Sequence, residues 1–135
     1  MEVLIKKSKH LGHFVSLVKK GRMVSFLRIF LGIVWIFMVY MVVSTSLESS
    51  LFKEWHFLGS IPWMRATLWD FYANVLVIYL WVLYRERNPA VKIMWAVIFF
   101  ALGSIGTIGY VLIQLFALKP GERAEEILKP KTVLR

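Results

Sequence analysis

The sequence has no cysteine among its 135 residues. This absence excludes disulfide bonds, thiol catalysis, haem attachment through thioethers, and zinc or iron–sulfur sites built on cysteine. Acidic residues are scarce too, since 8 Asp and Glu face 17 Lys and Arg, for a formal net charge of +9. Of the 3 histidines, His10 and His13 lie three positions apart. They have no other strong ligand nearby, so no metal site is predicted.

The usual signatures of chemistry are also missing. Gly103, Gly106 and Gly109 recur within an apolar run without an accompanying lysine, which excludes a phosphate-binding loop. There is no nucleophile–base constellation and no nucleotide motif, so we predict no catalytic residue and no cofactor. The first long apolar run starts near Phe26, and no small-residue cleavage site follows it. We therefore interpret this run as a retained span rather than a signal peptide.

What the sequence does have is apolar length. Hydrophobic residues make up 59% of the chain and concentrate in residues 26–45, 66–84 and 93–116. A helix rises about 1.5 Å per residue, so each of these runs is long enough to cross a hydrocarbon core of about 30 Å. The predicted fold class is an all-α membrane protein with three transmembrane helices, preceded by a basic amphipathic segment.

The runs divide the chain into three parts. Residues 1–25 form the basic segment, in which Leu11, Phe14, Val15 and Val18 follow helical spacing. Such a segment can lie among lipid headgroups, and the alternative is a flexible basic tail that only sets topology. Residues 26–118 form the three-span helical domain, and residues 119–135 form a polar C-terminal tail.

The distribution of positive charge predicts orientation. Ten Lys and Arg lie in the N-terminal segment through Arg28 and in the turn at residues 85–92, against seven in residues 46–65 and the tail. The positive-inside rule then places the N-terminus in the cytoplasm and the C-terminus outside. Attraction to anionic lipids accounts for the basic excess. Nucleic-acid binding is not predicted, because no basic stripe belongs to a soluble module.

Asp70 is the unusual residue of the second apolar run, about one turn inside it. Thr67, Asp70 and Asn74 share one helix face by their spacing. A carboxylate that faces lipid at the membrane centre costs about 2.5–3.5 kcal/mol. We therefore expect Asp70 to turn inward, towards other helices or a wet cavity.

Three alternating spans predict a polar cluster around Asp70. The first and third spans run the same way, so their polar ends share a leaflet with the polar start of the second. We expect Asp70 to accept hydrogen bonds there, with Arg65 at the rim. The predicted cluster consists of Tyr40, Ser44, Arg65, Thr67, Asp70, Asn74, Thr107, Tyr110 and Gln114. It either fixes helix packing, at about 0.6 kcal/mol per polar contact, or forms a site for a proton, a small ligand or a lipid headgroup.

The order of short motifs adds a resemblance. Residues 62–63 (PW), 66–68 (ATL), 70–72 (DFY) and 74–75 (NV) are followed by residues 81–82 (WV), 84–86 (YRE), 103–105 (GSI) and 114–116 (QLF). The chain resembles, over about residues 28–118, a small plant and bacterial membrane-protein family that is known only as a domain of unknown function. The resemblance implies a short multi-span helical protein and no assigned reaction.

The sequence favours a non-enzymatic accessory or assembly subunit, in a homo-oligomer or a larger membrane complex. Three alternatives remain open. A small transporter or channel protomer would pair three-helix units around a shared site. A lipid-binding or small-ligand-binding protein would use the polar cluster. A membrane enzyme acting on lipid would rely on Asp70 with His56 and Arg65.

Overall fold

The computed structural model describes residues 1–131, and the side chains of residues 2–11 and 13–20 lie outside its described part. Its elements are α1 (Glu2–Glu48), α2 (Leu51–Leu58), α3 (Pro62–Arg85), α4 (Pro89–Leu102), α5 (Ser104–Phe116) and the 3₁₀ helix η1 (Ala124–Leu128). The described residues contain no strand, which confirms the predicted all-helical class.

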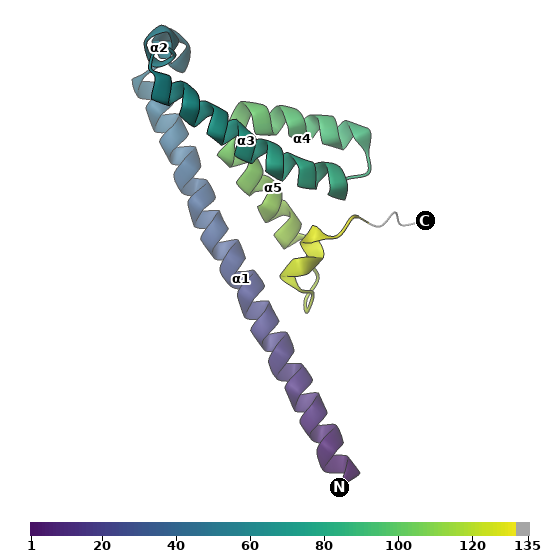
Figure 1. Cartoon of the computed structure of the whole chain (residues 1–135). Helices are drawn as coiled ribbons and strands as arrows, with labels where there is room; N and C mark the ends of the chain where they lie inside the picture. Colours follow the sequence, from purple (N-terminus) through teal and green to yellow (C-terminus); the bar gives the residue numbers. More distant parts are fainter. Residues whose placement is uncertain (132–135) are drawn as a thin grey trace.

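α1 is one uninterrupted helix of 47 residues (Figure 1). At about 1.5 Å per residue it is roughly 70 Å long. Its part Gly21–Glu48 is long and apolar enough to cross a membrane. The predicted boundary at residue 25 falls inside this helix, and the amphipathic face predicted from residues 11–18 lies outside the described side chains. The domain boundaries therefore stay predictions.

α3 is the second helix that is long and apolar enough to cross a membrane. It starts with Pro62, which is favoured in the first helical position because the missing N–H would have no partner there. α2 connects it to α1, and the Gly59 N–H closes α2 on the Trp55 carbonyl at 2.7 Å. In Figure 1, α2 lies at the end where α1 and α3 come together.

The predicted third span is not one helix, because the chain turns at Gly103. This residue has φ +50° and ψ −118°, and a Cβ placed on it would lie 2.4 Å from Cζ of Phe71. The prediction of a single helix over residues 93–116 is corrected to two helices, α4 of 14 residues and α5 of 13. Each is about 20 Å long, which is shorter than a hydrocarbon core of about 30 Å.

α4 and α5 are each antiparallel to the helix on which they pack, α4 to α3 and α5 to α1. α4 returns along α3, where the Tyr79 hydroxyl donates to the Lys92 carbonyl at 3.1 Å. α5 is antiparallel to α1, because Trp35 Nε1 donates to the Ile105 carbonyl at 3.1 Å while Arg28 reaches the other end of α5. Only α4 keeps the direction that the sequence predicted for the third span.

The turn at Gly103 also determines where residues 119–131 lie. Residues 119–131 follow α5 and lie at the end of the molecule where α3 stops, on the Arg28 side of α1 (Figure 1). The sequence predicted this tail at the opposite end from the basic N-terminal segment. That placement is corrected, since it assumed that the last apolar helix ends where α1 ends.

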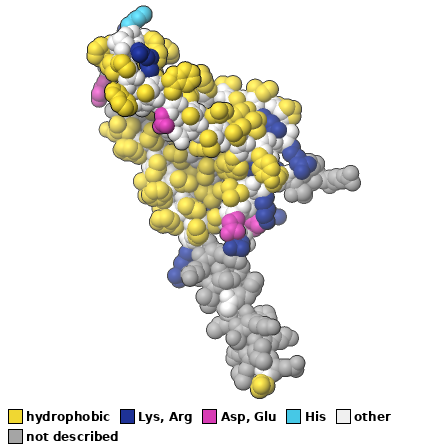
Figure 2. All heavy atoms as spheres, in the orientation of Figure 1, with side chains coloured by type: hydrophobic (Ala, Val, Ile, Leu, Met, Phe, Trp, Pro, Cys, Tyr) yellow, Lys and Arg dark blue, Asp and Glu magenta, His cyan; other side chains and the backbone are white. Residues whose placement is uncertain are grey.

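The core is small and aromatic. Val82, Phe99 and Tyr110 are fully buried, and the Tyr110 ring packs edge-on against Trp95, with ring centroids 4.8 Å apart. Such aromatic pairs contribute about 0.5–1.5 kcal/mol each beyond their buried area. Many of the remaining large hydrophobic side chains are exposed, and yellow hydrophobic side chains predominate on the described part of the face seen in Figure 2. On α1, for example, Ile36 is 65% exposed.

Candidate functional site

The C-terminal end of α3 carries two adjacent charged residues that are buried. Arg85 is 8% exposed and Glu86 is 5% exposed. α3 ends between them, since Glu86 adopts an extended backbone while its N–H still donates to the Val82 carbonyl at 2.8 Å. Buried charges are tolerated only when other groups satisfy them. We call Arg85, Glu86, Tyr110, Gln114 and Lys131 the polar junction.

Arg85 joins three elements through its guanidinium. Its Nε donates to Oε1 of Gln114 on α5 at 3.1 Å. Its Nη1 donates to the carbonyls of Ile127 and Lys129 at the end of η1, the latter at 2.5 Å. In return, the Lys131 N–H donates to the Arg85 carbonyl at 3.1 Å. A planar group with five donors suits this convergence of acceptors.

Glu86 is held by a hydroxyl and an ammonium group. Its Oε1 accepts from the Tyr110 hydroxyl at 2.9 Å and lies 2.5 Å from Nζ of Lys131. No group of three metal-ligating side chains occurs in the part of the chain that the structure describes. The polar junction thus fastens α3, α5 and the segment after η1 together.

α1 is fastened to α5 at the same end. Arg28 donates from Nε and Nη2 to the Leu115 carbonyl at 3.1 and 2.7 Å, and its guanidinium lies 5.3 Å from the centroid of the Phe116 ring. A cation is favourable at the C-terminal end of a helix, where carbonyls lack intrahelical partners. Arg28 therefore caps α5 next to the polar junction.

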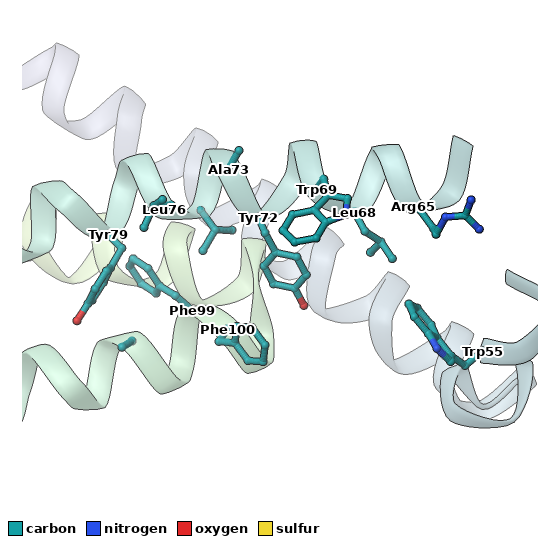
Figure 3. Close-up of a pocket in the computed structure, with 12 residues that line it drawn as sticks. Trp55, Arg65, Leu68, Trp69, Tyr72, Ala73, Leu76, Tyr79, Phe99 and Phe100 are labelled. Carbon is teal, nitrogen blue, oxygen red and sulfur yellow. The ribbon is translucent and has the colours of Figure 1, made fainter. Parts of the chain in front are cut away.

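A groove of about 720 Å³ lies between α3 and α4, with α2 at one end. Its lining is apolar and aromatic apart from a few polar atoms and consists of Trp55, Arg65, Leu68, Trp69, Tyr72, Ala73, Val75, Leu76, Tyr79, Ala96, Phe99 and Phe100. Figure 3 shows Arg65 and Trp55 at one end of the groove and Tyr79 at the other.

A family model described as "Protein of unknown function (DUF1475)" matches residues 11–128. The chain belongs to the DUF1475 family. The predicted resemblance to a family of unknown function is confirmed, although the match tests neither the motif nor the spans. No curated protein and no solved structure matches the chain. The part matched to DUF1475 includes four residues of the polar junction and stops before Lys131.

This DUF1475 chain does not bring the nine predicted site residues together. Tyr110 and Gln114 belong to the polar junction, and Thr107 is buried beside them on α5, where its hydroxyl donates to the Ser104 carbonyl at 3.2 Å. Tyr40, towards the other end of α1, is 65% exposed. Ser44 lies on α1, one turn after Tyr40, and is half-buried.

The remaining four predicted residues lie near the start of α3. Asn74 Nδ2 donates to the Asp70 backbone carbonyl at 2.9 Å, Thr67 Oγ1 donates to the Trp63 carbonyl at 2.8 Å, and Arg65 Nη1 donates to the Gly59 carbonyl at 2.7 Å. These bonds are local to their own stretch of chain.

Asp70 itself is exposed, and its carboxylate accepts no hydrogen bond from any residue that the structure describes. Two expectations are corrected: Asp70 does not turn inward within this chain, and it does not pair with Tyr110 or Gln114. The cause is the turn at Gly103, which sends α5 to the opposite end of α3.

Sequence reasoning missed Arg85, Glu86 and Lys131 as site residues, because Arg85 and Lys131 were counted among the charges that set orientation and Glu86 was noted only as part of the motif at residues 84–86. The signal that points to them is twofold. Opposite charges are adjacent at the end of an apolar helix, and Tyr110 and Gln114 lie four positions apart on one face of the last helix. A charge pair and a polar stripe of this kind are complementary.

Proposed function

We propose that this DUF1475 protein is an integral membrane protein without catalysis of its own, an accessory or assembly subunit that binds a second polypeptide through the Asp70 face of α3. The Asp70 face consists of Thr67, Asp70 and Asn74. The observation that carries the proposal is the exposed Asp70 carboxylate, which has no partner among the described residues of its own chain.

The membrane location is supported by the exposure of the two long apolar helices. In α1, Phe26, Ile29 and Ile33 are each more than 60% exposed, and in α3 Val77 is 66% exposed. Large contiguous apolar surfaces of this kind are rare in water and are normal in lipid or against another apolar partner.

The position of Asp70 along α3 supports a protein partner. It lies eight positions after Pro62, about 12 Å along α3 at 1.5 Å per residue. A carboxylate at such a depth is costly against lipid, and such residues usually face a protein interior or a polar cavity. Since the described residues of this chain offer neither, a donor from another subunit satisfies Asp70 in the proposed complex.

Co-purification in mild detergent tests the partner. We expect the tagged wild-type protein to migrate as a complex larger than the monomer, and Asp70→Leu to lose that complex. Glu48→Gln is the matched control, because Glu48 is an exposed carboxylate at the same end of the molecule, in the last turn of α1. A wild-type protein that purifies only as a monomer contradicts the proposal, as does an Asp70→Leu variant that keeps the complex.

We further propose that α1 and α3 span the membrane and that α4 and α5 form a helical hairpin, which enters from the Arg85 end and returns to it. Support comes from the turn at Gly103, which packs against Phe71, a residue within α3. Irregular backbone at membrane depth is tolerated where protein buries it, and Gly103 is buried. Both chain ends then lie on one side.

The charge distribution favours this topology over three spans. Of 17 Lys and Arg, only Lys53 in α2 and Arg65 in the first turn of α3 belong to the α2 end in this topology. The other 15 belong to segments that adjoin the Arg85 end in this topology, whereas three spans divide the charges ten to seven. The positive-inside rule therefore predicts that the Arg85 end faces the cytoplasm and the α2 end faces outward.

Single-cysteine labelling tests the topology, because the chain has no cysteine of its own. We place cysteines at three exposed positions, in Ser50→Cys, Arg87→Cys and Glu125→Cys. A maleimide that cannot cross the membrane is expected to label Ser50→Cys in intact cells and the other two only after lysis. Labelling of Glu125→Cys in intact cells would contradict the hairpin and support the three-span topology.

A further inference from the structure

We propose that the groove between α3 and α4 binds one acyl chain of an anionic phospholipid, whose headgroup phosphate is bound by Arg65 at the α2 end. This inference rests on the proposed membrane location and not on the proposed protein partner. It assigns a ligand to a surface that lies away from the Asp70 face.

The groove has a shape with two different ends. Along α3 it extends from Arg65 to Tyr79, and 14 residues at 1.5 Å make it about 21 Å long. One leaflet of a hydrocarbon core of about 30 Å is roughly 15 Å deep, so the groove is long enough to hold an acyl chain over a whole leaflet. Ala73 and Ala96 line it and leave room between the aromatic rings.

The Tyr79 hydroxyl at the other end of the groove is not available to donate a hydrogen bond to a ligand. The Tyr79 hydroxyl already donates to the Lys92 carbonyl at 3.1 Å. Between Tyr79 and Arg65 the lining residues are aliphatic or aromatic, and the polar groups of their side chains are the Trp69 indole N–H and the Tyr72 hydroxyl (Figure 3). A ligand that lies along the groove is therefore apolar over most of its length and is polar only at the opposite end.

The α2 end supplies that polar group. Arg65 is exposed and uses Nη1 for the Gly59 carbonyl at 2.7 Å, and no bond from its Nε or Nη2 to a described residue is seen. Trp55 lies beside it and is 48% exposed (Figure 3). Arginine binds phosphate oxygens through several donors, and tryptophan favours the headgroup level of a bilayer. Charge complementarity thus selects an anionic headgroup over a second apolar helix.

Native mass spectrometry of the full chain, purified in mild detergent, tests the ligand. Phosphatidylglycerol and phosphatidylcholine with identical acyl chains are added separately. We expect the wild-type protein to bind phosphatidylglycerol about tenfold more tightly, the factor that 1.4 kcal/mol of charge-assisted binding gives. Arg65→Gln is expected to abolish this preference, and Arg65→Lys is expected to retain most of it.

Two matched controls separate the groove from general effects. Lys53→Gln removes the other Lys or Arg at the α2 end and is expected to leave the preference unchanged, because Lys53 does not line the groove. Ala73→Trp fills the groove and is expected to weaken binding of both lipids at least tenfold. Ala101→Trp makes the same change at an exposed α4 position outside the lining and is expected to change neither.

Several outcomes overturn the inference. Equal binding of both lipids by the wild-type protein refutes the selection of an anionic headgroup, and unchanged binding by Ala73→Trp refutes binding in the groove. A dimer that Ala73→Trp dissociates, without loss of lipid, assigns the groove to a second copy of the chain. Membrane fractionation of each variant keeps the two proposals distinct, because a protein that stays in the membrane fraction without binding lipid refutes only the groove.

Discussion

The two ends of α3 carry similar charged residues, which are buried at one end and exposed at the other. At the Arg85 end, Arg85 and Glu86 are buried, and their side chains bond to other elements. At the Pro62 end, Arg65 and Asp70 are exposed, and the hydrogen bonds around them stay within a few residues along the chain. Both ends pair a cation with an anion in sequence, yet only one pair is satisfied by the fold.

This difference separates charged residues whose side chains join several elements from charged residues that the fold leaves exposed. A buried charge whose partner is removed costs several kcal/mol, so the Arg85 end is where substitutions should destabilise the protein. An exposed charge contributes little to stability, so substitutions at the Pro62 end should act on binding instead. The following variants test the comparison, with stability measured as the free energy of unfolding in mixed micelles.

Arg85→Met should have the largest effect. It removes the donors that bind Gln114 and the carbonyls after η1, and we expect it to lower the free energy of unfolding by about 3–5 kcal/mol, the range for breaking a buried charged network. Limited proteolysis should then cleave near η1 sooner than in the wild-type protein.

Arg87→Met is the control for Arg85→Met, because Arg87 is exposed two positions away and should change stability by less than about 0.5 kcal/mol. An Arg85→Met protein as stable as this control would show that the polar junction does not hold the fold.

Gly103→Ala should come second. Its φ of +50° is strained for any residue with a Cβ, which costs about 1–3 kcal/mol, and the new methyl group meets the Phe71 ring. Gly103→Ala with Phe71→Leu should recover only the part of the loss that is due to the ring.

Gly32→Ala is the matched control for Gly103→Ala, since a Cβ there meets no atom within 4 Å and alanine favours a helix by up to about 1 kcal/mol. If Gly103→Ala is as well tolerated as Gly32→Ala, the turn between α4 and α5 is not required for stability, and a continuous third helix regains support.

Tyr110→Phe should destabilise less, by about 1.5–2 kcal/mol. It keeps the ring that packs on Trp95 and removes only the hydroxyl that donates to Glu86, and hydrogen bonds to charged groups contribute about 1.5–3 kcal/mol. The same change at Tyr40, which is 65% exposed, should have almost no effect. Equal effects of the two substitutions would refute a special role of the polar junction.

Asp70→Asn should have the smallest effect on stability, below about 0.5 kcal/mol, because the carboxylate is exposed and accepts no hydrogen bond from the described residues. A loss above about 1 kcal/mol in the isolated protein would mean that Asp70 is satisfied within the chain, and the comparison between the two ends would fail.

Part of the candidate site could be predicted from the sequence. The predicted polar cluster includes Tyr110 and Gln114, and both lie in the polar junction. Their partners could not be predicted, because pairing them with Asp70 assumed that depth follows from counting spans. The turn at Gly103 reverses the direction of α5. Gln114 and Tyr110 therefore bond to Arg85 and Glu86 instead of Asp70.

The sequence by itself determined the helical class, the two long apolar helices and the family, because apolar periodicity, helix length and short motifs are local properties of the chain. Only the tertiary structure decided which charges are buried and at which end of α3 residues 119–131 lie. Those features depend on a turn at Gly103 that packs against Phe71 and on side chains far apart in sequence, such as Arg85 and Lys129. A hydrophobicity pattern contains no information about such contacts, since it records how apolar a residue is and not which residue it meets.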